Sequence, residues 1–188
     1  MKTLIRTALA ATLLAGGSLG LSGAAFAQSE MPMVGGAPMD PAKPIPDNAS
    51  KASNLTTLVA AVKAAGLAET LGGTGPFTVF APTNEAFEKL PAGTVDTLLK
   101  PENKATLTKI LTYHVVPAKA TSEAAMKMVK DDGGMHKVKT VAGEELTLSM
   151  EGDKLVVTDA KGGKATVTQA DVMQSNGVVH VIDAVLMP

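Results

Sequence analysis

The chain has 188 residues, of which 45% are hydrophobic, and its formal net charge at pH 7 is −1. These values are typical of a globular protein with one domain and short flanks, and they exclude an intrinsically disordered chain. The sequence contains no cysteine, which excludes disulfide bonds and thiol chemistry.

Residues 1–27 are predicted to be a secretory signal peptide. Lys2 and Arg6 supply the positive charges at its start, an apolar stretch follows, and Ala25-Phe26-Ala27 matches a small-x-small cleavage site. Glycines interrupt the apolar stretch too early for a membrane span. We therefore expect a mature protein that begins at Gln28, is secreted or periplasmic, and has no stable membrane span after cleavage.

Cleavage at this site would also remove the only arginine of the chain, Arg6. Nucleic-acid recognition prefers the guanidinium fork and aromatic stacking, and the remaining chain has one tyrosine and no tryptophan. No nucleic-acid partner is therefore expected.

Residues 28–50 are predicted to form a flexible tether. This stretch is rich in Pro, Gly and Met and shows no hydrophobic period, which is typical of an extended linker. The folded domain is then expected to cover residues 51–188.

Helical spacing of apolar residues dominates the first half of the domain. Asn54 is expected to cap a helix that ends at Gly66, and residues 67–71 add a further turn. Later helices are predicted to begin at Thr94, near Pro101 and at Ser122, the last one covering residues 122–130. A short strand is predicted over residues 113–116.

The decapeptide at residues 78–87, TVFAPTNEAF, predicts a sharp change of structure. Its first three residues favour a strand, and Pro82 must end that strand because it lacks a backbone donor. Thr83 or Asn84 can then cap a helix. The segment is therefore expected to join a strand directly to a short helix.

From Met135 onward, the hydrophobic period changes to two residues, which indicates strands. Turn residues such as Gly152-Asp153 and Asn176-Gly177 separate them. The expected strands cover residues 136–141, 145–150, 154–159, 164–169, 178–182 and 185–186. A helical first half and a meandering second half predict an α+β fold with antiparallel sheets.

The decapeptide resembles the first signature segment of the fasciclin domain family. The Tyr113-His114 pair and residues 176–183, NGVVHVID, resemble two further features of that family in the same order. The resemblance covers residues 50–188 and implies one domain, a wedge of two antiparallel-rich sheets with a helical cluster. It also implies a cell-adhesion or interaction module that binds a protein or glycan of the cell surface or extracellular matrix.

The resemblance suggests four partner-binding residues. Tyr113 and His114 lie in a region that animal fasciclin domains use for integrin contacts, and Asp171 and Met173 match an acidic-hydrophobic motif with the same role. A structural alternative stays open for each pair. Asp171 can simply begin a strand with Met173 buried, and His114, like His180, can be a hydrogen-bonded core histidine.

No catalytic or metal site is predicted, and no cofactor is expected. Ser175, His180 and Asp183 are close in sequence, but an extended strand does not make them a triad, and no GxSxG elbow exists. No HxH or HExxH spacing supports zinc. The protein is therefore expected to be non-enzymatic.

Methionines provide an alternative function, that of an exported protein that binds Cu(I). Thioethers are soft ligands that select Cu(I). The candidates are Met31, Met33 and Met39 in the tether and a second group of Met126, Met128, Met135 and His136. The competing interpretation is that Met126 and Met128 fill gaps in the core.

Overall fold

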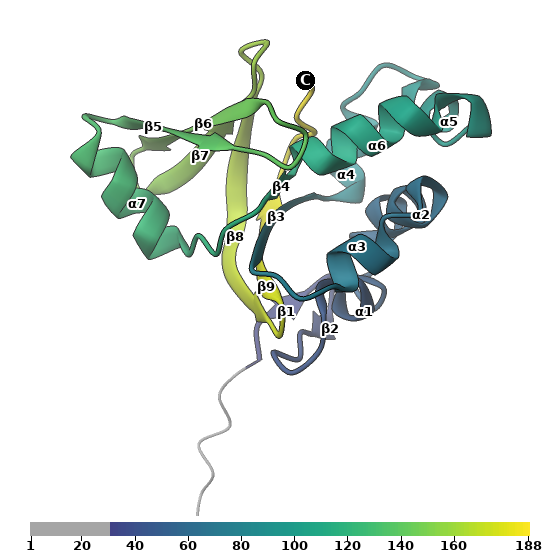
Figure 1. Ribbon diagram of the computed structural model, residues 1–188, viewed down its shortest axis with the longest axis horizontal. Coiled ribbons are helices and arrows are strands. Elements are labelled where there is room, and N and C mark those ends of the chain that lie inside the picture. Colours follow the sequence, from purple (N-terminus) through teal and green to yellow (C-terminus); the bar gives the residue numbers. More distant parts are fainter. Residues whose placement is uncertain (1–30) are drawn as a thin grey trace, which may run out of the picture.

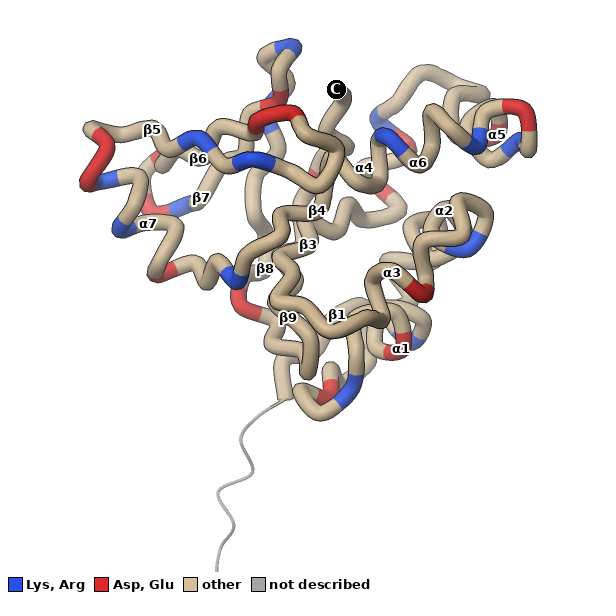
Figure 2. Tube along the Cα trace, in the orientation of Figure 1, with Lys and Arg blue, Asp and Glu red and all other residues tan. Residues whose placement is uncertain are grey.

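Two parallel strands, β3 (Phe77–Pro82) and β9 (Gly177–Ile182), form the centre of the sheet in the computed structural model, which describes residues 31–188. Neither strand carries a charged residue, and Figure 2 shows that the acidic and basic positions lie elsewhere, on helices, loops and outer strands. Strands that are covered on both faces read as continuous apolar runs. All six residues of β9 are buried, as expected for a central strand.

Within residues 31–188, the sheet has seven strands in the order β4-β3-β9-β8-β7-β6-β5, and only the β3–β9 pair is parallel. The other strands are β4 (Val115–Val116), β5 (Met135–Lys139), β6 (Glu145–Glu151), β7 (Lys154–Thr158) and β8 (Lys164–Gln174). The predicted α+β class is confirmed, and Figure 1 shows the strongly curved sheet.

The two sheets of the expected wedge are joined in this continuous sheet because they share β8. The first part of β8 pairs with β7 through Lys164, Ala165 and Thr166, and the rest pairs with β9. Two register shifts interrupt the β8–β9 ladder between Val167 and Val172. Such bulges bend and twist a strand, which explains how one strand serves both halves.

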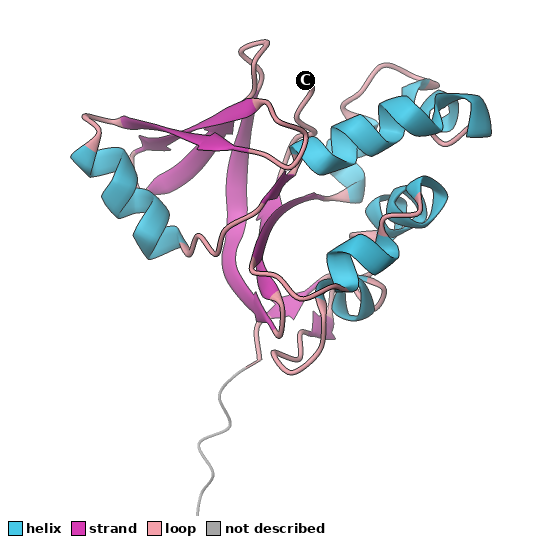
Figure 3. Ribbon diagram, in the orientation of Figure 1, coloured by secondary structure: helices cyan, strands magenta, loops and turns pink. Residues whose placement is uncertain are grey.

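The helices are distributed unequally over the two halves of the sheet that share β8 (Figure 3). The helix α7 (Ser122–Asp131) packs against β5, β6 and β7. The remaining helical elements gather beside the central strands: α1 (Ile45–Ala49), α2 (Thr56–Ala65), α3 (Ala68–Gly72), α4 (Asn84–Glu88), α5 (Thr94–Leu98), η1 (Pro101–Asn103) and α6 (Lys104–Tyr113). None of the helices within residues 31–188 combines the length and apolar character that a membrane crossing requires.

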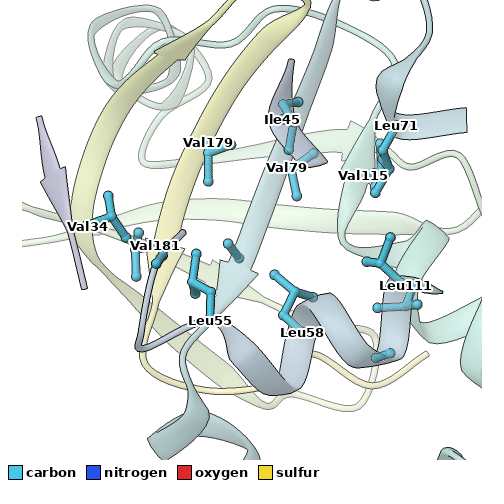
Figure 4. Packing of buried hydrophobic residues seen from close by; sticks show 14 of the residues in the cluster. Val34, Ile45, Leu55, Leu58, Leu71, Val79, Leu111, Val115, Val179 and Val181 are labelled. Atoms are coloured by element: carbon cyan, nitrogen blue, oxygen red, sulfur yellow. The ribbon is translucent and has the colours of Figure 1, made fainter. Parts of the chain in front are cut away.

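The central strands separate two hydrophobic cores. Val79, Val179 and Val181 pack with the helices in the first core, which Figure 4 shows from close by. Phe80 and Ile182 point to the other face and pack with α7 and strands β6–β8. The side chains of β9 therefore alternate between the two cores, in agreement with the two-residue hydrophobic period of the sequence.

The expected flexible tether is wrong for residues 33–50. The strands β1 (Met33–Val34) and β2 (Ala37–Pro38) pair as a hairpin, and α1 follows. Val34 and Met39 are each only 2% exposed, and both belong to the first core. Isolated apolar residues between prolines and glycines gave no hydrophobic period, yet Val34, Met39 and Ile45 are buried in the first core. The predicted signal peptide at residues 1–27 and residues 28–30 lie outside the described residues.

The predicted strand at residues 113–116 is also wrong in its first half. The helix α6 continues to Tyr113, and His114 is its C-cap. Only Val115 and Val116 pair with β3. The predicted final strand at residues 185–186 is absent, because that segment has no strand partner.

Candidate contact surface around Asp171

The decapeptide forms the predicted junction between strand and helix. Strand β3 ends at Pro82, and Thr83 caps α4 by accepting a hydrogen bond from the Ala86 N–H at 3.3 Å. Asn84 does not cap its own helix. Its Oδ1 accepts from the Thr57 N–H at 3.0 Å, so Asn84 caps α2, the role predicted for Asn54.

Tyr113 is completely buried, with 0% of its surface exposed. Its hydroxyl donates to the carbonyl of Glu145 at 3.1 Å and accepts from the Ala160 N–H at 2.9 Å. Burial raises the pKa of this hydroxyl. Tyr113 therefore fastens α6 to β6 and to the loop after β7, and it offers no surface to a partner.

His114 is 2% exposed and uses both ring nitrogens inside the protein. Nδ1 donates to the Ile110 carbonyl at 2.8 Å, and Nε2 accepts from the Leu186 N–H at 3.0 Å. These two bonds require the neutral ring, and burial lowers the pKa of His114 to about 4. This is the geometry of a structural histidine. The prediction that Tyr113 and His114 contact a partner does not fit the buried positions of both side chains.

His180 is the second buried histidine and lies on β9. Its Nε2 donates to the Ala120 carbonyl at 2.8 Å, and its Nδ1 accepts from the Asp171 N–H at 3.3 Å. Its ring stacks on Phe80 with 5.7 Å between centroids. Burial lowers the pKa of His180, so this ring is neutral as well.

Asp171 lies at the irregular part of β8 with a positive φ of 56°. Its carboxylate accepts hydrogen bonds from the Ser122 N–H at 2.7 Å and from the Ser122 hydroxyl. The side chain is half-buried, and it connects β8 to the first residue of α7. Asp171 is thus partly exposed, and its carboxylate also has a structural role, because it holds the start of α7 against β8.

Ser122, Asp171 and His180 do not form a catalytic triad. The imidazole contacts the backbone N–H of Asp171 and not its carboxylate, and its other nitrogen faces a carbonyl. The sequence neighbours Ser175 and Asp183 lie elsewhere: Ser175 is exposed, and Asp183 accepts from the Thr166 N–H at 2.8 Å.

The loop formed by Pro117, Ala118 and Lys119 is exposed but firmly held. The Thr78 hydroxyl donates to the Ala118 carbonyl at 2.5 Å and accepts from the Ala120 N–H at 2.8 Å. His180 holds Ala120, and Asp171 holds Ser122, through the bonds already given. Three side chains from three strands therefore fix an exposed loop.

Met173 lies on the same side of the sheet as this loop. Strand register pairs Met173 with Val178, and Val178 with Thr78, which contacts the loop directly. Paired residues of adjacent strands share one face. We define the Asp171 surface as Pro117, Ala118, Lys119, Asp171 and Met173.

A polar hollow of about 430 Å³ adjoins the Asp171 surface at Lys119. Residues 72–76 and 174–177 form its other walls. Gly75 and Gly177 allow these walls to approach, because a Cβ on Gly75 would overlap the Asn176 carbonyl and one on Gly177 would overlap the Phe77 carbonyl. The hollow is therefore shaped by backbone rather than by long side chains.

The methionines proposed as copper ligands are divided among different environments. Met39 is in the core, whereas Met31 and Met33 are 50% and 55% exposed. Met126 and Met128 are half-buried on α7, and His136 pairs with Asp132. Within the described residues, no three His, Cys, Asp or Glu side chains are grouped to hold a metal ion. Copper binding stays a prediction.

A family model for the fasciclin domain matches residues 53–188. The chain belongs to the fasciclin domain family. A relative from Synechocystis, protein sll1483, is 48% identical over 192 residues, which cover all of this chain and 99% of the relative. The transforming growth factor-beta-induced protein ig-h3 of the pig is 40% identical over 136 residues, 72% of this chain but only 18% of that protein.

Among solved structures, the fasciclin domain is similar to a FAS1 domain pair from the insect cell adhesion molecule Fasciclin I. The TM-score is 0.51 and the sequence identity is 26%, over 67% of this chain and 42% of the other. This fasciclin domain thus shares its fold with a domain of an adhesion molecule.

Sequence reasoning proposed Asp171 and Met173 as contact residues, and it did not indicate the residues that organise the surface around them. The local pattern marks Thr78 only as a strand residue and Ser122 only as the start of a helix. Their partners, Ala118 and Asp171, lie 40 and 49 residues away, respectively. No local pattern indicates pairings of this kind.

Proposed function

We propose that this fasciclin domain is an exported, non-catalytic interaction module that binds a protein or glycan of the cell surface or extracellular matrix through the Asp171 surface. The observation that carries the proposal is the exposed loop at Pro117–Lys119, which Thr78, His180 and Asp171 hold in one conformation. A rigid surface loses less conformational entropy on binding than a mobile one.

The chemistry of the surface supports contact binding. Pro117, Ala118 and half-exposed Met173 supply apolar area, and exposed Lys119 supplies a charge next to the polar hollow. Interfaces commonly combine an apolar anchor with polar groups at the rim. Similarity to a cell adhesion molecule supports the same class of function.

The histidines support a non-catalytic role. Both ring nitrogens of His114 and of His180 are engaged by backbone groups, which leaves neither ring free to transfer a proton. General acid–base catalysis requires a titratable group within reach of a substrate. These two buried rings do not meet that requirement.

Adhesion of protein-coated beads to the native cell envelope and to extracellular matrix tests the proposal. We expect the double variant Lys119→Glu/Met173→Ser to lower bead retention at least about tenfold, because it changes the charge and the apolar anchor together. Lys139→Glu, on the exposed edge of β5, is the matched charge control and should retain full adhesion. Unfolding curves must first show that both variants are folded.

Equal adhesion of the double variant and the wild type would remove the Asp171 surface from the proposal. Turnover of a substrate by the wild type would contradict the non-catalytic role. Asp171 itself is unsuited to this test, because its carboxylate also holds Ser122 and a loss of adhesion would not separate contact from folding.

A further inference from the structure

A narrow cleft of about 60 Å³ lies in the first core, between the helices α1–α3 and the central strands. Ile45, Leu58, Leu71, Val79 and Val179 contribute to its walls, and Figure 4 labels these side chains in the packed first core. The cleft is partly open to solvent. Ala49 of α1, Val59 of α2 and exposed Lys63 of α2 line it where the two helices reach the surface.

Apart from Lys63 at the opening, the polar side chains in the walls already have partners. His114 uses both ring nitrogens on backbone groups, and the Gln174 side chain accepts a hydrogen bond from Asn48. The two buried polar atoms that lack a partner within the described residues belong to Asn54 and Glu144, which do not line the cleft. An apolar cavity without free polar groups stays dry and favours an apolar occupant.

The volume limits what can enter. An engineered apolar cavity of about 150 Å³ takes a benzene molecule. At the same cavity volume per carbon atom as in that benzene site, a cleft of 60 Å³ has room for two or three carbons. These would be the last carbons of a linear alkyl chain. The rest of such a ligand must lie at the opening, beside Ala49 and Val59.

Lys63 is suited to bind the polar end of the ligand. It is exposed at the opening, and no acidic partner lies within 4 Å of its ammonium group among residues 31–188. We propose that this cleft binds a short-chain alkanoate, with the alkyl end between α1, α2 and the central strands and the carboxylate at Lys63. This site lies in the helical half of the domain and does not depend on the adhesion proposal.

Methyl NMR on the mature full chain can test the site with sodium acetate, propionate, butyrate and hexanoate, because the alkyl chains of the first three span one to three carbons and that of hexanoate exceeds the cleft. We expect shifts at the methyl groups of Ile45, Leu58 and Val179, and none at Val129 and Leu146 in the second core. Affinity should rise about fourfold for each methylene until the cleft is full, and then level off. An absence of shifts in the first core, or equal shifts in both cores, would overturn the proposal.

The corresponding n-alkanols and a charge variant test the role of Lys63. Lys63→Gln should weaken alkanoate binding about two- to fivefold, as expected for one exposed ion pair, and leave alkanol binding unchanged. Lys130→Gln, at the end of α7, is the matched control and should bind like the wild type. Equal alkanoate affinity of Lys63→Gln and wild type would overturn the assignment of the carboxylate to Lys63.

Filling the cleft provides the steric test. Ala49→Leu adds volume from α1, and Ala68→Leu adds it from α3. In each variant that folds, neither the alkanoates nor the alkanols should shift the methyl signals of the first core. Unchanged binding in either variant would show that the ligand lies elsewhere. If neither variant folds, the chain-length series on the wild type decides the question.

Discussion

The Nε2 atom of His180 lies 2.8 Å from the carbonyl oxygen of Ala120, a residue 60 positions earlier in the chain. The other ring nitrogen accepts the Asp171 N–H, so the neutral ring bridges β8 and the exposed loop before α7. Protonation would place a second N–H on the ring, where it would face the Asp171 N–H. The geometry of the Asp171 surface therefore depends on a neutral histidine.

This dependence predicts acid sensitivity of folding. An unfolded histidine binds a proton near pH 6.5, whereas burial lowers the pKa of folded His114 to about 4 and shifts that of His180 in the same direction. The unfolded state thus binds more protons as the pH falls. The stabilising contribution is complete above pH 6.5 and is lost from pH 6.5 towards pH 4.

Urea unfolding at pH 7.5, 6.0 and 5.0 should show this loss. Each buried histidine contributes a slope of up to about 1.4 kcal/mol per pH unit within the window. The variant His114→Gln should show a shallower slope than the wild type because one titrating group is gone. A free energy of unfolding that stays constant from pH 7.5 to 5.0 would contradict the prediction.

Asp171→Ala should destabilise the domain and loosen the loop before α7. Loss of the carboxylate leaves the half-buried Ser122 N–H without its partner, which costs about 1–3 kcal/mol. Urea melts should give a lower midpoint with an unchanged slope, and amide hydrogen exchange should quicken at Ala120 and Ser122. Glu88→Ala, at an exposed end of α4, removes a carboxylate and should change stability by less than about 0.5 kcal/mol. Unaltered exchange in Asp171→Ala would refute the anchoring role.

Gly177→Ala should be strongly destabilising, because the added Cβ would overlap the Phe77 carbonyl across the central parallel pair. Forced overpacking of this kind costs about 1–3 kcal/mol or more. Gly72→Ala is the matched control, since the nearest atom to its Cβ is the Pro46 ring at 3.9 Å. Thermal melts of the two variants make the comparison. Equal melting temperatures would mean that β3 and β9 can separate at little cost.

Met39→Ala should cost about 2–4 kcal/mol, because this side chain is 2% exposed in the first core. Met33→Ala, six residues earlier and 55% exposed, should change stability by less than about 0.5 kcal/mol. Chemical denaturation distinguishes a packed segment from a tether. If both variants were as stable as the wild type, residues 33–50 would behave as the flexible tether that the sequence predicted.

Local rules predicted the features whose causes are adjacent in sequence. Pro82 and Thr83 stand next to each other, so the end of β3 and the start of α4 could be placed correctly. Glycine-containing pairs such as Gly152-Asp153 marked hairpins of the second half. The two-residue period after Met135 predicted a strand whose side chains alternate between two faces, and those of β9 do so.

Features with distant causes were misjudged. Tyr113 has a side chain that favours strands, but α6 extends to it, and the Nδ1 of His114 satisfies the Ile110 carbonyl near the helix end. Met39 and Ile45 follow no hydrophobic period, because each packs as an isolated residue into a core formed mostly by residues later in the chain. At the candidate site, the partner of Asp171 is 49 residues away, which local reasoning cannot find.

The central parallel pair has a consequence for the order in which the chain acquires its structure. Strand β3 ends at Pro82, and its partner β9 begins at Gly177, so the middle of the sheet cannot close until β9 has been synthesised. Contacts between such distant segments form slowly, because a long loop must close before they contribute any stabilisation. A nascent chain that lacks β9 would expose both cores. Such a delay leaves the polypeptide accessible to chaperones until β9 has been made.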